Sequence, residues 1–153
     1  MKINVGCGML PLPGYVNIDK YDDSAAEVFA DPLTLEYEDV EEVTLFHVVE
    51  HLAIGEAPRL LHHVAGWLKP GGRLVVEVPD MEAIMREPGS HWVTDIYGVQ
   101  THEGEFHRSG WTASTLTDLV YGVGLFPDKV ETFLSTHPWR MGMPCVLVEA
   151  EKR

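Results

Sequence analysis

The stretch Asn4-Val5-Gly6-Cys7-Gly8 decides the fold class of this 153-residue chain. Lys2 to Val5 has the pattern of a short β-strand, and the strand ends at a Gly-x-Gly turn. Glycine lacks a Cβ atom, so the backbone at positions 6 and 8 can approach a ligand closely. Open α/β sheets bind small molecules at the carboxyl ends of their strands. The opening of the chain therefore predicts a ligand-binding loop.

A second short strand is predicted at Tyr15 to Ile18, and it ends at Asp19. Pro11 and Pro13 lie between the two strands. Proline removes a backbone donor and clashes with the preceding helical turn, so this stretch cannot form a helix of any length. The sequence therefore predicts that a Pro/Gly loop replaces the first helix of the α/β unit.

Strands and helices alternate along the rest of the chain. Apolar residues recur every three or four positions from Ile54 to Leu68, which predicts an amphipathic helix that stops at the turn Pro70-Gly71-Gly72. A second amphipathic helix is predicted at Thr112 to Val123. Further strands are predicted at 27–30, 43–46, 74–78, 129–134 and 145–150. The apolar run at 74–78 favours a sheet that is covered on both faces.

The segment from residue 81 to residue 110 is less regular, and it predicts a short helix followed by a long binding loop. The last two predicted strands have no helix between them. This order predicts an α/β fold with a Rossmann-like sheet, parallel except for one antiparallel strand near the edge.

The composition fits a single domain over residues 1–153, with 45% hydrophobic residues. The 11 Lys and Arg against 24 Asp and Glu give a net charge of −13, which disfavours general binding to nucleic acid or to anionic membranes. The two cysteines lack a metal-binding spacing, and no apolar run is long enough for a signal core or a membrane span. We expect a soluble, cytoplasmic protein; the pattern does not indicate its oligomeric state.

Four motifs, in this order, resemble the class I S-adenosylmethionine-dependent methyltransferases, especially a compact subgroup of that family. They are Asn4-Val5-Gly6-Cys7-Gly8, Val16-Asn17-Ile18-Asp19, Val48-Val49-Glu50-His51-Leu52, and Leu68 to Gly72 followed by Val78-Pro79-Asp80. The resemblance extends over essentially the whole chain. It implies a methyltransferase sheet, S-adenosylmethionine as the cofactor and a small-molecule acceptor.

The resemblance places the cofactor on the loop of Gly6, Cys7 and Gly8, with Asp19 accepting both ribose hydroxyls. A dinucleotide is the competing ligand, but Pro11 stands at the third glycine position and prevents the helix N-terminus that a pyrophosphate needs. The usual methyltransferase also has a helix here. Because this chain does not, we expect the backbone amides of residues 6 to 10 to hold the cofactor's carboxylate.

Three further residues are implied as cofactor contacts. Asp31 would accept the amino group of the adenine, and a plain Asp-Pro turn is the alternative. Phe46 and His47, at the end of a predicted strand, would line the methionine arm. Burial in the core is an alternative for Phe46.

The predicted catalytic residue is His107. His102 and His107 lie in the irregular segment that, in the resembled family, passes over the methyl group. A neutral histidine can accept a proton near pH 7, so His107 is interpreted as the base or as an acceptor-positioning group, with a structural hydrogen-bonding role as the alternative. Candidates for the acceptor pocket, for which core packing is the alternative, are Trp92, Tyr97, Trp111 and Trp139.

The segment His47-Val48-Val49-Glu50-His51 also fits H-x-x-E-H, a zinc-hydrolase motif. That motif needs its two histidines on one uninterrupted helix and a third protein ligand beyond it. Here the first histidine falls at the end of a predicted strand, so we expect no metal.

We therefore predict a methyltransferase that acts on an oxygen or nitrogen atom of a small polar or sugar-like acceptor. Two alternatives remain from other classes. The first is a non-catalytic S-adenosylmethionine-binding domain with a regulatory or partner role. The second, more distant, is a zinc hydrolase that uses the HVVEH segment.

Overall fold

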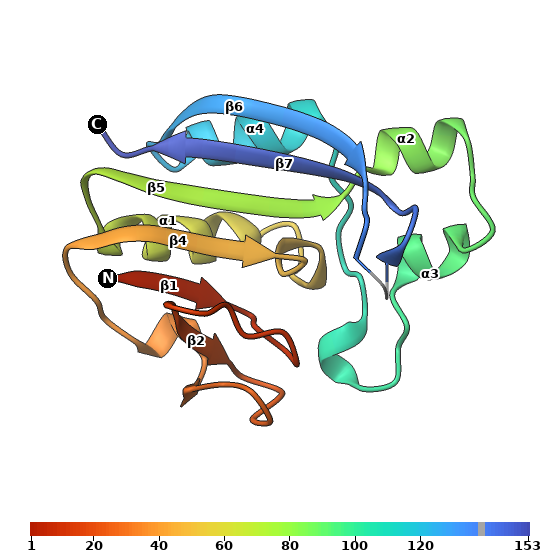
Figure 1. Ribbon diagram of the computed structural model, residues 1–153. Coiled ribbons are helices and arrows are strands. Elements are labelled where there is room, and N and C mark those ends of the chain that lie inside the picture. Colours follow the sequence, from red (N-terminus) through yellow and green to blue (C-terminus); the bar gives the residue numbers. More distant parts are fainter. Residues whose placement is uncertain (138–139) are drawn as a thin grey trace.

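The structure is a computed structural model, and it describes residues 1–137 and 140–153. Its centre is a seven-stranded sheet in the order β3-β2-β1-β4-β5-β7-β6 (Figure 1). The strands are β1 (Lys2–Val5), β2 (Val16–Asp19), β3 (Val28–Phe29), β4 (Val40–Phe46), β5 (Leu68–Pro79), β6 (Phe126–Leu134) and β7 (Pro144–Glu151).

In the described parts of the chain, four α-helices and three short 3₁₀ turns connect these strands. The helices are α1 (Ala57–Trp67), α2 (Met81–Arg86), α3 (Trp92–Tyr97) and α4 (Ala113–Gly122). The 3₁₀ turns are η1 (Pro32–Thr34), η2 (Val49–His51) and η3 (Glu103–Glu105). Thr112 caps α4 through a reciprocal capping box with Thr115, as a helix start at that residue predicts. No helix in the described part of the chain is long and apolar enough to cross a membrane.

The sheet is parallel except at β7, which runs antiparallel to both β5 and β6. The prediction of a mostly parallel α/β sheet with one antiparallel strand near the edge is confirmed. The carboxyl ends of β1, β2, β4 and β5 consequently meet at one edge of the sheet. Residues 6–15 connect β1 to β2 without a helix, which confirms the predicted Pro/Gly loop.

The two faces of the sheet differ. Both α1 and α4 lie behind the sheet in Figure 1, and they pack on one buried apolar layer that includes Ile3, Val43 and Leu74. On the other face, Asn4 hydrogen-bonds to Asn17 and to Thr44. The expectation of a sheet covered on both faces along 74–78 is wrong, because burial alternates along β5, which is typical of a sheet with one apolar face.

The turn predicted at Pro70-Gly71-Gly72 is also different in the structure. β5 begins directly after α1, and the sequence Pro70-Gly71-Gly72 lies within it as an irregularity, where the pairing with β4 jumps from Leu68 to Arg73. Gly71 adopts a left-handed φ of 75° and donates to the carbonyl of Lys152. The chain beyond β7 therefore provides hydrogen-bond partners for the backbone of this segment, and the segment does not form a separate turn.

The segment 81–110 contains more regular structure than predicted. Besides the short helix α2, it forms α3 and η3, and the backbone of His107 returns to donate to the carbonyl of Tyr97. These elements lie beyond the carboxyl ends of the strands (Figure 1). The segment therefore forms a wall over that edge of the sheet.

Candidate functional site

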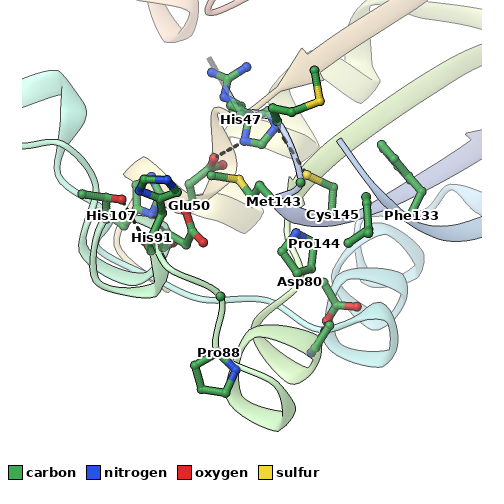
Figure 2. Close-up of a pocket in the computed structure, with 18 of the residues that line it drawn as sticks. His47, Glu50, Asp80, Pro88, His91, His107, Phe133, Met143, Pro144 and Cys145 are labelled. Carbon is green, nitrogen blue, oxygen red and sulfur yellow. Dashed lines mark hydrogen bonds and ion pairs between the residues drawn. The ribbon is translucent and has the colours of Figure 1, made fainter. Parts of the chain in front are cut away.

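Two cavities lie side by side at the carboxyl edge of the sheet. The first, which we call the glycine-loop cavity, has a volume of about 1290 Å³ and contains the residues from Gly6 to Leu12 in its wall. The second, the His107 cavity, has a volume of about 1220 Å³ and is bounded by α2, α3 and the start of β7 (Figure 2). Both cavities share the residues His47, His51, Glu105, Phe133 and Arg140. The shared wall means that ligands in the two cavities would meet.

Gly6 occupies a position that no other residue can take without strain. Its φ is 73°, in the left-handed region, and a Cβ atom there would lie 2.4 Å from Cγ2 of Val48. Gly8 also has a left-handed φ, 47°, but open space surrounds it. The first glycine therefore lets β1 pack against the segment after β4, and the second leaves room in the cavity.

This difference predicts unequal effects of the same substitution. Gly6→Ala is expected to lower the free energy of unfolding by about 2 to 5 kcal/mol, because it adds a steric clash to the left-handed strain. Gly8→Ala is expected to cost only about 1 to 2 kcal/mol, from the left-handed strain alone. Urea unfolding followed by circular dichroism measures both. Equal losses would contradict the close approach of Gly6 to Val48.

Asp19 lies at the end of β2 in the wall of the glycine-loop cavity, and its carboxylate already accepts three backbone hydrogen bonds. Gly8 N donates to Oδ2 at 2.8 Å, and the amides of Tyr21 and Asp22 donate to Oδ1 at 2.8 and 3.0 Å. Asp19 thus joins the glycine loop to the loop after β2. A carboxylate has about four lone-pair positions, so one acceptor position on Oδ2 remains for a ligand.

Asp31 and Phe46 also lie in the wall of the glycine-loop cavity. Asp31 caps η1 by accepting from Leu33 N at 3.0 Å, and Lys20 Nζ lies 3.4 Å from its other oxygen. Asp31 therefore forms the Asp-Pro turn and also lies beside the cavity. Phe46 is half-buried at the end of β4 and is not part of the closed core.

The backbone amides expected to hold a carboxylate are largely engaged. The amides of Gly6 and Cys7 both donate to the carbonyl of Ile18, and that of Leu10 donates to Cys7. With Gly8 bound to Asp19, four of the five amides from residue 6 to residue 10 have protein acceptors. Two arginines, Arg59 and Arg108, also lie in the cavity wall, and Arg108 is ion-paired with Glu56 at 2.8 Å.

His47 is a buried ionic centre, although it was expected only to line a ligand arm. It has a left-handed φ of 55°, and its ring lies between two carboxylates. Nδ1 donates to Glu50 at 3.1 Å and Nε2 donates to Glu77 at 3.0 Å. The side chains of His47 and Glu50 are only 3% and 2% exposed. His47 therefore contributes to both cavities mainly by fixing the end of β4.

The ionisation of this pair follows from its hydrogen bonds. Burial alone would lower the pKa of His47, but hydrogen bonds with Cys145 and with the two glutamates outweigh burial and raise the pKa to about 11. Burial alone would raise the pKa of Glu50, but the hydrogen bond and the charge of His47 outweigh it and lower that pKa to about 2. The pair is charged at neutral pH.

His107 lies in the wall of the His107 cavity and is held from several directions. Its Nδ1 lies 3.0 Å from the carbonyl oxygen of Asp95, and its ring contacts the ring of His51 edge to face, with centroids 4.8 Å apart. The neighbouring amide of Arg108 donates to the carbonyl of Glu50 at 2.8 Å. Burial lowers the pKa of His107 despite the negative charge of Glu50, so the ring is neutral near pH 7.

The three described aromatic residues among those proposed for the acceptor pocket do not form one. Trp111 is buried in the core, and Trp92 and Tyr97 are exposed outside both cavities. Trp139 lies outside the described residues. The sequence around these aromatic residues did not show whether each one lies in a cavity wall, in the core or on the surface.

Sequence reasoning missed Asp95 and Cys145. Asp95 is buried in the wall of the His107 cavity, and burial raises the pKa of its carboxyl. Cys145 is buried at the start of β7, with its sulfur 3.9 Å from Nε2 of His47. Both residues stand in segments with no motif, so only the folded chain brings them to the site.

The HVVEH segment does not form a metalloprotease helix. His47 ends the strand region with both ring nitrogens bonded to carboxylates, and Val49–His51 is a single 3₁₀ turn. The two histidines therefore do not lie one turn apart on one helix, as that motif requires.

Comparisons with known proteins bear on the fold. No protein-family model matches the chain, and no curated protein matches it in sequence. Solved structures do match across 99% of the chain. A methyltransferase from Methanosarcina mazei has 14% identity and a TM-score of 0.69 and is covered over 91% of its length. One from Archaeoglobus fulgidus has 18% identity and a TM-score of 0.70 and is covered over 85%.

A third similar structure is the 1,6-didemethyltoxoflavin-N1-methyltransferase of Burkholderia thailandensis, solved with its substrate and S-adenosylhomocysteine. It has 14% identity and a TM-score of 0.70, and 70% of its chain is covered. The strand order, the antiparallel β7 and these likenesses define one fold. The chain has the fold of the class I S-adenosylmethionine-dependent methyltransferases.

Proposed function

We propose that this protein is an S-adenosylmethionine-dependent methyltransferase that acts on an oxygen or nitrogen atom of a small polar acceptor. One observation carries the proposal: two cavities, each large enough for a small molecule, meet at His47 and His51 on the carboxyl edge of the sheet. One cavity contains the glycine loop and Asp19. The other contains His107. A cofactor and an acceptor would each have a place, and their reacting atoms would meet at the shared wall.

The residues of the glycine-loop cavity fit S-adenosylmethionine. Gly8 leaves open space where a side chain would stand, and Asp19 keeps one acceptor position for a ribose hydroxyl. Asp31 lies in the same wall, where it could accept from the adenine. Arg59, and Arg108 once it leaves its ion pair with Glu56, would supply positive charge for the cofactor's carboxylate in a chain whose net charge is −13.

The His107 cavity suits the acceptor. When bound, the cofactor supplies an electrophilic methyl group, and the protein has to align the acceptor, exclude water and handle one proton. The acceptor lone pair forms the new bond to carbon while the sulfur–carbon bond breaks and its electron pair returns to sulfur. His107 and the buried Asp95 lie in the wall where the acceptor's proton would leave. We propose His107 as the residue beside the reacting atom.

Calorimetry tests cofactor choice directly. We expect S-adenosylmethionine and S-adenosylhomocysteine to bind one site per chain and to compete with each other. NAD is expected not to bind, because residues 6–15 provide no helix N-terminus for its pyrophosphate. Tight NAD binding would contradict the proposal.

A turnover screen separates the enzyme from the non-catalytic alternative. Release of S-adenosylhomocysteine is measured with a broad panel of small hydroxyl and amine acceptors. Turnover with any of them supports the enzyme. Cofactor binding without turnover across the panel would instead favour a regulatory or partner domain.

A further inference from the structure

The wall of the His107 cavity contains an unsatisfied carboxylate. Glu50 Oε2 is buried and has no hydrogen-bond partner among the described residues, while Oε1 accepts from His47. A buried oxygen without a partner destabilises the folded chain, and more strongly when it is charged. Such atoms are rare in folded proteins, so this oxygen is a candidate to bind a water, an ion or a ligand group.

Two histidines surround this carboxylate. Ligand atoms from Glu50, His51 and His107 all lie within 4.8 Å of one another. The three residues come from two segments, η2 and the chain after η3, which are joined by the amides of Arg108 and Ser109 donating to the carbonyl of Glu50. Figure 2 shows Glu50 with His47 on one side and His107 on the other.

The hydrogen bonds of both histidines leave a nitrogen lone pair available. Nδ1 of His51 lies 3.2 Å from the carbonyl oxygen of Phe106, and Nδ1 of His107 lies 3.0 Å from that of Asp95. A carbonyl oxygen only accepts, so in each ring Nδ1 carries the hydrogen and Nε2 carries the lone pair. Metal-binding histidines are typically held by such a bond to a carbonyl, which fixes the tautomer and the ring orientation.

We propose that Glu50, His51 and His107 bind one divalent transition-metal ion. Two imidazole nitrogens and one carboxylate oxygen are the donor set of open zinc sites and of non-haem iron sites, which keep positions free for substrate or water. Ligands held about 2.1 Å from one ion lie roughly 3 to 3.5 Å apart, so small side-chain rotations bring this cluster to binding geometry. His47 would then act as the outer partner that orients the Glu50 carboxylate.

A second group of metal-ligand residues exists in the described chain but is less suitable. It consists of His47, Glu77 and Cys145. Both ring nitrogens of His47 already donate to carboxylates, so an ion there would have to displace a buried ion pair. The sequence alone led us to expect no metal, because the motif needs both histidines on one helix and a third protein ligand, and the first histidine of HVVEH falls at the end of a predicted strand. The fold supplies that ligand as His107 and excludes His47.

The ion would face the acceptor side of the site. Glu50, His51 and His107 all lie in the wall of the His107 cavity, whereas of the three only His51 also reaches the glycine-loop cavity. An acceptor hydroxyl or amine bound to the ion would lose its proton more readily. The proton-handling role proposed for His107 would then be exerted through the ion. Metal binding itself does not depend on methyl transfer.

The test uses metal alone as the probe. The intact chain, freed of metal by a chelator, is titrated with Co²⁺ and with Zn²⁺. We expect one ion per chain and visible d–d absorption of Co²⁺, without the near-ultraviolet band of a thiolate ligand. His51→Gln and His107→Gln should each weaken binding at least about 100-fold, because even loss of an outer partner typically costs 10- to 100-fold.

Two controls make the result decisive. His62→Gln, at an exposed position of α1, should keep the wild-type affinity, and the absence of a thiolate band in the Co²⁺ spectrum excludes the competing group that contains Cys145. Circular dichroism shows whether each variant is folded; His51 and His107 are only partly buried, so their variants carry the test even if Glu50→Gln does not fold. Absence of stoichiometric binding, unchanged affinity in both histidine variants, or a thiolate band in the Co²⁺ spectrum would overturn the proposal. S-adenosylmethionine binding is measured separately, so its failure would contradict the proposed function alone.

Discussion

Replacing His107 with glutamine is expected to slow methyl transfer by about 10²- to 10⁴-fold, the usual range for a group that handles a proton. The cofactor's dissociation constant should stay within about threefold, because His107 lies in the wall of the acceptor-side cavity and not in that of the glycine-loop cavity. Single-turnover rates with an acceptor found in the screen, and calorimetry with S-adenosylhomocysteine, measure the two quantities.

The matched control for this substitution is His62→Gln, on the exposed surface of α1. It should change neither the rate nor the binding. If His107 only holds the chain together through its bond to Asp95, His107→Gln should lower the melting temperature and leave the turnover of the folded fraction intact. That outcome would remove His107 from the reaction.

Asp19→Ala is expected to weaken S-adenosylmethionine binding by about 1.5 to 3 kcal/mol, because a charge-assisted hydrogen bond to the ribose is lost. The structure adds a second expected effect. The amides of Gly8, Tyr21 and Asp22 would lose their acceptor, so the free energy of unfolding should also fall. Calorimetry measures the first effect and urea unfolding the second.

Asp19→Asn separates these two effects. The amide oxygen can still accept from Tyr21 and Asp22, whereas the amide nitrogen would face the N–H group of Gly8. We expect a smaller loss of stability than in Asp19→Ala, together with weaker cofactor binding. An unchanged dissociation constant in both variants would show that Asp19 does not face the ribose.

The sequence predicted the sheet well because its signals were local and strong. The glycine turn after β1, the acid at the end of β2 and the two prolines between them predicted the first βαβ-like unit without its helix, and the structure has that arrangement. The strand β5 was less predictable. The residues Pro70-Gly71-Gly72 are typical of a turn, but long-range hydrogen bonding with Lys152 makes them part of the strand.

The candidate site was only partly predictable, because its two halves are encoded differently. The glycine-loop half consists of residues at the ends of predicted strands. The pattern of strands along the sequence indicates that these residues share one edge of the sheet. The other half depends on contacts between Glu50 and the segment around His107, over fifty residues away. A periodic pattern in the sequence does not predict such a contact. His47 was placed at the right edge of the sheet, but its buried ion pairs could not be predicted, since they depend on partners such as Glu77 and Cys145 from other strands.

The antiparallel strand β7 has a consequence for how the chain is made. Among the strands of the described residues, β6 pairs only with β7, and β5 presents an open edge until β7 pairs with it. A growing chain that has emerged only as far as residue 143 therefore exposes the edge of a buried strand and has an unpaired β6 beside it. Exposed strand edges of this kind promote aggregation during folding. Synthesis of Pro144–Glu151 covers the edge of β5 and pairs one edge of β6 at the same time, so a chain truncated just before this strand would be prone to self-association.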